Sequence, residues 1–290
     1  MNFYYPTSGG SSLKWFYQTS SLIYQYGGSV YSEDGLSVAI DSKESKEALT
    51  TLAEFYTKYA FPQSVASFYN SFRYNKLPFG VTDFSTYLTL KNAAPELVGQ
   101  WSITLLPGTK RDINKDGVIE DDEIDRSYIA AGTSGVIFKN KSSDEKLKQC
   151  WEFYKWWLSS SVQTEFQLTL QSTYGPEYVW LSSNINAVKN SSIDVEDKEI
   201  ILQMVDWMID INRTPGQYMV ERTLSNIWNK MAISGVSPAL AIESSLLSMN
   251  REVKKKMVEF GYIDNDYNIL KPYYVRDKAW IENKYEGGNA

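Results

Sequence analysis

Apolar and polar residues follow two different periods along this chain. Apolar residues recur every three or four positions in several segments, which predicts amphipathic helices, here over residues 11–26, 42–61, 64–75, 143–158, 162–170, 184–188, 195–211, 217–234 and 237–260. Shorter apolar runs bounded by Gly and Pro predict strands at 77–81, 101–106 and 128–138, and a hairpin over 30–40. The pattern therefore predicts a helix-rich α/β protein.

The stretch from Leu77 to Gly108 is the centre of this pattern, because it predicts a strand, a helix and a second strand in succession. Asp83 is placed to cap the helix through its carboxylate. In a βαβ unit the ligand lies beyond the carboxyl ends of the strands. Asp83, Phe84 and Tyr87 lie where such a ligand would bind, although Phe84 and Tyr87 fit equally well as core residues.

Composition narrows the chemistry. The 290 residues carry a net charge of −6, which leaves no basic footprint for nucleic acid. The absence of His removes His-based triads and the usual zinc sites. The single Cys150 excludes an internal disulfide and is expected to be a small buried hydrophobe. No run has transmembrane length and no signal peptide begins the chain, so we expect an excised piece of a longer precursor.

The sharpest motif is the segment from Asp112 to Glu123, which matches the twelve-residue loop of EF-hand and dockerin-type calcium sites. Gly117 stands where the loop turns sharply. Oxygen ligands fall in register at Asp112, Asn114, Asp116, Val118 (through its carbonyl), Glu120 and Glu123. The motif predicts one structural calcium ion. The alternative is an acidic surface turn between two strands.

Several short sequence segments, taken in their order along the chain, resemble segments of the extracellular solute-binding proteins of ABC transporters. The resemblance is to the carbohydrate-binding group, which includes maltose-binding protein. They are Gly27-Gly28, Ser45 to Leu49, Phe72 to Val81, Gly99 to Gly108, Gly132 to Ile137, Trp151 to Leu158 and Ser234 to Ala241. The βα units and lipobox Cys that begin such proteins are absent here, and most of the family lacks the calcium loop.

The resemblance implies a helix-rich, periplasmic-binding-protein-like type II α/β fold with two lobes, of which the N-lobe is incomplete. Residues 1–76 would be the first part of the C-lobe, and 77–127 would return to the N-lobe and carry the calcium loop. Residues 128–263 would complete the C-lobe, and 264–290 would form a tail.

The resemblance also implies that a sugar or oligosaccharide binds between the lobes and is delivered to an ABC permease. The matching segments supply the candidate ligand residues Trp15, Tyr17, Asp83, Phe84, Tyr87, Thr133, Ser134 and Arg222. Trp15 and Tyr17 do not share a helical face, and Arg222 fits equally well as a solvated surface charge. The protein would be an extracellular monomer, lipid-anchored as a precursor, and not an enzyme. A calcium-stabilised adhesion or scaffold module, or a binding protein for a peptide or another solute, remains an alternative.

Overall fold

The computed structural model describes residues 3–5, 12–62, 65–130, 133–138, 143–175, 177–209 and 214–275, with side chains omitted for 12–15. These residues divide into two compact units. Unit 1 comprises residues 1–82, 106–130 and 207–290, and unit 2 comprises 83–105 and 131–206. The boundaries differ from those of the predicted segments, and the lobe assignments stay a prediction. No described helix combines the length and apolar character that crossing a membrane requires.

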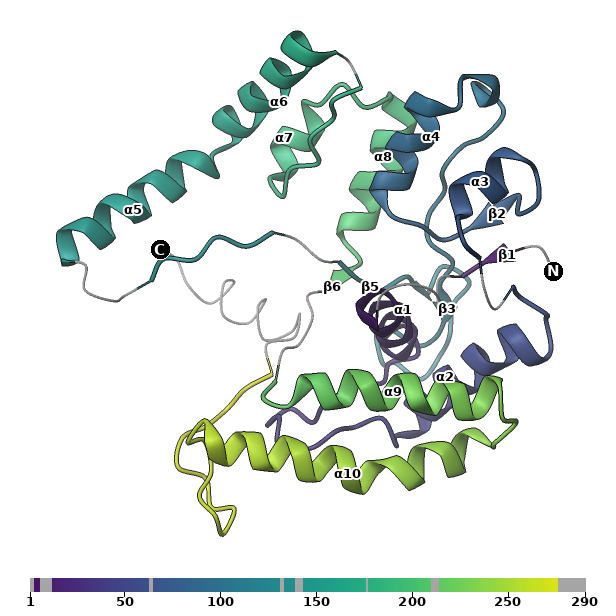
Figure 1. Cartoon of the computed structure of the whole chain (residues 1–290), viewed down its shortest axis with the longest axis vertical. Helices are drawn as coiled ribbons and strands as arrows, with labels where there is room; N and C mark the ends of the chain where they lie inside the picture. The colour runs from purple at the N-terminus through teal and green to yellow at the C-terminus, as the bar shows by residue number, and fades with distance from the viewer. Residues whose placement is uncertain are drawn as a thin grey trace. The chain divides into compact units, whose positions relative to one another are not determined.

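Unit 1 is built on four packed helices: α1 (Ser12–Gln25), α2 (Lys43–Thr57), α9 (Gln217–Ala232) and α10 (Pro238–Glu259). Each of them packs on at least two of the others, and α9 and α10 lie side by side in Figure 1. Their apolar faces form one core that includes Ile23, Leu52, Leu224, Ile227 and Met249. The predicted helices form here because their apolar stripes meet one another and leave water.

Three two-stranded ladders and a short helix, α3 (Phe68–Arg73), complete unit 1. Strand β1 (Phe3–Tyr4) pairs in parallel with β2 (Phe79–Gly80), and β5 (Tyr128–Ile129) pairs in parallel with β6 (Met208–Ile209). Strands β3 (Thr109–Lys110) and β4 (Ile124–Asp125) are antiparallel. The predicted hairpin over 30–40 is confirmed by an antiparallel bridge between Tyr31 and Val38.

Unit 2 contains α4 (Phe84–Ala93), the 3₁₀ turn η1 (Pro95–Leu97), α5 (Asp144–Trp157), α6 (Ser160–Tyr174), α7 (Ile185–Lys189) and α8 (Val195–Val205). Helix α6 packs on α7, and α7 packs on α8. Its buried apolar residues are few among those described: Tyr87, Leu90, Ala94, Ala187, Val188 and Ile193. Neither α5 nor α8 buries a single residue.

Several sequence predictions about local structure are wrong. Residues 101–106 form no strand, although their side chains alternate in exposure, because no other described strand pairs with them. The predicted βαβ unit is therefore not formed, and β2 pairs with β1 instead. Among the described residues of the predicted strand 128–138, only Tyr128–Ile129 are in a strand. The predicted helix 195–211 ends at Val205, because the backbone beyond it pairs with β5.

Candidate functional site

The first turn of α4 holds the three residues that the sequence placed at a ligand site. The Asp83 carboxylate is the N-cap: Oδ1 accepts hydrogen bonds from the Thr86 backbone N–H at 3.0 Å and the Ser85 hydroxyl at 2.6 Å. The bond to the Thr86 N–H satisfies a backbone donor that the helix itself cannot satisfy. The predicted cap is confirmed, and this carboxylate oxygen already serves the helix.

Phe84 and Tyr87 lie one turn apart on α4 and stack, with ring centroids 5.3 Å apart and planes inclined by 20°. The two have different exposure, because Tyr87 is 7% exposed and Phe84 is half-buried. The Tyr87 hydroxyl donates to Asp197 Oδ2 of α8 at 2.7 Å. Burial, followed by this hydrogen bond, raises the pKa of Tyr87 far above its usual value. Tyr87 therefore joins α4 to α8, and Phe84 is the more accessible ring.

Two residues that sequence reasoning missed complete this cluster. The Lys91 ammonium lies 3.0 Å from Asp197 and also pairs with Asp194. It stands 5.6 Å from the centroid of the Tyr87 ring and 5.9 Å from that of Trp101. Lys91 could have been found from its i+4 spacing to Tyr87. Asp197 could not, because it is 110 residues away in sequence.

Thr133 and Ser134 also belong to unit 2, and both are exposed. Gly135 follows them and packs closely on α5. A Cβ atom added at Gly135 would lie 2.1 Å from Cε1 of Tyr154 and 2.5 Å from its hydroxyl oxygen. Glycine therefore allows this segment to approach Tyr154, as the interruption in the predicted strand suggested.

The remaining predicted ligand residues belong to unit 1. Tyr17 of α1 is half-buried and packs against the core. Arg222 of α9 is exposed and lines a groove beside α10. Trp15 belongs to α1, but its side chain is not among those that the structure describes. The eight candidates are thus divided between the two units, with Asp83, Phe84, Tyr87, Thr133 and Ser134 in unit 2.

The predicted calcium loop connects β3 to β4 and is closed by hydrogen bonds from backbone N–H groups. Asp112 Oδ2 accepts from Gly117 at 2.9 Å. Glu123 Oε1 accepts from Ile113 at 2.9 Å, and its Oε2 accepts from Glu120 at 3.1 Å. Gly117 has φ +91°, a conformation that favours glycine. The acidic side chains at both ends of the motif therefore point into the loop.

An ion pair between a partly exposed Arg and a buried Asp lies at the base of this hairpin. Arg111 Nε donates to Asp125 Oδ2 at 2.9 Å, and the Asp125 side chain is only 3% exposed. Asp125 Oδ1 also accepts from the Ser127 backbone N–H at 2.8 Å. Since removal of Arg111 would leave the Asp125 charge buried without its partner, the pair holds the base of the hairpin in one position.

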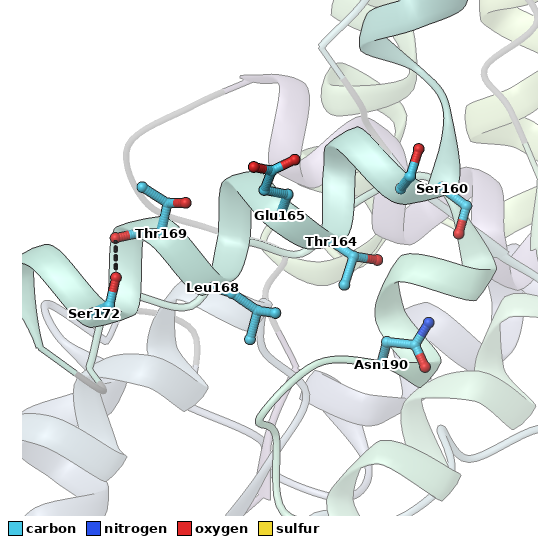
Figure 2. A pocket seen from close by; sticks show the side chains of 8 residues that line it. Ser160, Thr164, Glu165, Leu168, Thr169, Ser172 and Asn190 are labelled. Carbon is cyan, nitrogen blue, oxygen red and sulfur yellow. Dashed lines mark hydrogen bonds between the residues drawn. The ribbon is translucent and has the colours of Figure 1, made fainter.

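The described residues contain no group of three or more His, Cys, Asp or Glu side chains that is arranged to hold a metal. The described residues also form grooves, and in two of these most of the lining residues are polar or charged. One, of about 740 Å³, runs along α6, and Figure 2 shows Thr164 and Leu168 on the side of α6 that faces Asn190. The Ser172 hydroxyl at its end donates to the Thr169 carbonyl at 3.0 Å. The second groove, between α9 and α10, contains Arg222.

Comparison with known proteins finds likeness in structure and none in sequence. No family model and no curated protein matches the chain. A cyclic α-maltosyl-1,6-maltose binding protein from Arthrobacter globiformis matches with TM-score 0.60 and 15% identity, over 87% of this chain and 59% of its own. An ABC transporter solute-binding protein from Thermotoga lettingae, bound with α-D-tagatose, matches with TM-score 0.55 and 16% identity, over 82% and 56%.

An ABC substrate-binding protein from Listeria monocytogenes in complex with cycloalternan matches with TM-score 0.52 and 15% identity, over 86% of this chain and 57% of its own. The chain thus spans less than three fifths of the length of these proteins. All three are named as binding proteins. The predicted fold class is confirmed: this chain has the helix-rich α/β fold of type II periplasmic binding proteins.

Proposed function

We propose that this protein binds an extracellular sugar or oligosaccharide and delivers it to the permease of an ABC transporter. The observation that supports this most directly is the shared fold, over 82–87% of the chain, with proteins named for sugar binding or bound with a sugar. Phe84, Tyr87, Lys91 and Asp197 together are called the α4 cluster. Phe84 is its more accessible ring and offers a face on which a sugar ring stacks. The interlobe position of the ligand and the other predicted ligand residues stay predictions.

Isothermal titration with D-tagatose, maltose, maltotriose and a cyclic α-glucan tests this proposal. We expect one of these sugars to bind saturably and to be recovered unchanged. Phe84→Ala should weaken that binding about tenfold, because loss of one stacked ring costs on the order of 1.4 kcal/mol. Phe153→Ala is the matched control, since Phe153 of α5 is 58% exposed and lies outside the α4 cluster. Failure of every sugar to bind, or the appearance of a cleaved product, would contradict the proposal.

We further propose that the loop from Asp112 to Glu123 holds a structural calcium ion. Its candidate donors are all oxygens, which fits a hard cation that takes about seven oxygen ligands. The ligands would come from Asp112, Asn114, Asp116, Glu120, Glu123 and the Val118 carbonyl. Calcium would then fix the hairpin that Arg111 and Asp125 anchor. Because these carboxylates accept backbone hydrogen bonds in the described loop, ion binding would compete with those bonds.

Thermal unfolding with calcium and with a chelator tests the calcium proposal. Calcium should raise the melting temperature of the wild type by several degrees, because an ion that binds only the folded state stabilises it. Glu123→Gln should abolish the increase. Asp122→Asn removes a charge of the same sign at an exposed position without a predicted donor and should retain it. The same melting temperature in calcium and in chelator would identify an acidic surface turn instead.

We also propose that the chain is part of a longer, extracellular two-lobed protein. The unburied helices α5 and α8 and the two-stranded parallel ladders support this, because parallel sheets are normally covered on both faces. Sequencing the coding DNA on both sides of this segment tests it. Flanking βα units would support the proposal, and unrelated flanking domains would favour the adhesion or scaffold alternative. Lipid anchoring and a monomeric state stay predictions.

A further inference from the structure

The groove between α9 and α10 has a distinctive composition. It has a volume of about 630 Å³, and its lining side chains are polar except for Met219. Two of them, Arg222 and Lys230, are cationic, and none is a carboxylate. The whole chain carries a net charge of −6, so this groove is a local region of opposite sign. A cleft lined by one sign of charge concentrates ligands of the opposite sign.

Several hydrogen-bond donors in this groove are free to meet a ligand. The Lys230 ammonium donates to the Ser244 hydroxyl of α10 at 2.9 Å, which fixes its position. In the part of the chain that the structure describes, no hydrogen bond or ion pair involves the Arg222 guanidinium or the side-chain amides of Asn226 and Asn229. On α10, Glu243 precedes Ser244 but does not line the groove, and Glu252 accepts a hydrogen bond from the Tyr218 hydroxyl at 2.5 Å.

The spacing of these residues indicates the size of the ligand. Arg222 and Lys230 are eight residues apart on α9, which corresponds to about 12 Å at 1.5 Å per residue. Asn226 and Asn229 lie between them and line the same groove. A guanidinium pairs with a carboxylate or phosphate through two parallel hydrogen bonds, and amides donate to and accept from hydroxyls. The groove thus offers an anion contact followed by a row of hydroxyl contacts.

We propose that the α9–α10 groove is a binding site for an acidic sugar, with its carboxylate or phosphate on Arg222 and its hydroxyls on Asn226 and Asn229. This site lies wholly in unit 1 and does not depend on the neutral-sugar site proposed above. It gives Arg222 a role other than contact with that neutral sugar.

Titration calorimetry with D-glucuronate, D-glucose 6-phosphate, D-glucose and inorganic phosphate tests the proposal. We expect D-glucuronate or D-glucose 6-phosphate to bind at least tenfold more tightly than D-glucose, which lacks the anionic group, and more tightly than inorganic phosphate, which lacks the sugar. Comparison of these two compounds shows whether the groove prefers a sugar with a carboxylate or a sugar with a phosphate. Binding should weaken when the salt concentration rises, because the contact is electrostatic and exposed.

Variants connect the binding to the groove. Arg222→Gln should lower the affinity for the acidic sugar at least tenfold, and Asn226→Leu severalfold. Lys148→Gln of α5 removes the same charge from an exposed position in unit 2 and should change nothing. Equal binding of D-glucose, binding of phosphate as tight as that of the acids, or unchanged affinity in Arg222→Gln would overturn the proposal. None of these results bears on the Phe84→Ala test.

Discussion

The sequence pattern did not decide whether Phe84 and Tyr87 of α4 contact a ligand or belong to the core. Phe84 and Tyr87 fitted both a ligand platform and a core, and the structure gives them different environments. Tyr87 is buried and bonded to Asp197, whereas Phe84 remains partly accessible. The difference arises from Asp197 and Lys91, whose contacts with Tyr87 exist only in the folded chain.

Replacement of Tyr87 by Phe should lower the free energy of unfolding by about 2 kcal/mol at pH 7, because a buried hydrogen bond to a charged group is lost. The folded-state pKa of Tyr87 is raised, so the stability that its hydroxyl contributes is present below about pH 10 and is lost as the pH rises further. The difference between wild type and variant should therefore narrow by about 0.8 kcal/mol at pH 10.5.

Urea denaturation of both proteins at pH 7 and pH 10.5 measures this difference. Tyr174→Phe is the control, because Tyr174 is 62% exposed at the end of α6. It should have little effect at either pH. A difference between wild type and Tyr87→Phe that is constant or widens with pH would contradict the assignment of the hydrogen bond.

At the scale of elements, one buried amide holds the junction between α5 and α6. Gln163 is 4% exposed, and its Oε1 accepts from the Trp180 indole N–H at 3.1 Å and the Ser182 hydroxyl at 2.8 Å. Its Nε2 donates to the Trp157 carbonyl at the end of α5 at 2.8 Å. Figure 1 shows α5 leading directly into α6 at this junction. The amide satisfies three groups at once.

Gln163→Leu should destabilise unit 2 by about 2–3 kcal/mol, because it leaves buried polar partners without hydrogen bonds. Gln149→Leu is the matched control, since Gln149 is exposed on α5, and it should change stability by less than about 0.5 kcal/mol. Trp fluorescence during urea unfolding would report both effects. Equal stability of the two variants would refute the role given to Gln163.

At the scale of the whole molecule, the two units differ in how many apolar side chains they bury. The principal apolar core lies entirely in unit 1, whereas α5 of unit 2 exposes Trp151, Phe153 and Trp156. Since burial of apolar surface is the main stabilising contribution, unit 2 is expected to open more readily.

Amide hydrogen exchange should therefore be at least tenfold faster in α5 than in α1, which has the same length of 14 residues. Exchange is carried out on the intact chain at pH 7. Digestion after quenching and mass spectrometry of the peptides then measure both helices in one sample. Equal protection of α5 and α1 would contradict the difference in stability between the units. Addition of a sugar that binds at Phe84 should slow exchange in α4.

The sequence by itself determined the positions of most helices, because apolar periodicity and caps such as Asp83 act within a few residues. It also located the hairpin loop from Asp112 to Glu123. Tertiary structure alone decided which extended segments pair: β5 and β6, nearly 80 residues apart, form a ladder, whereas 101–106 has no described partner strand. It also decided the surroundings of Tyr87 and Arg222, because the hydrogen bond of Tyr87 and the groove beside Arg222 depend on residues that are distant in sequence.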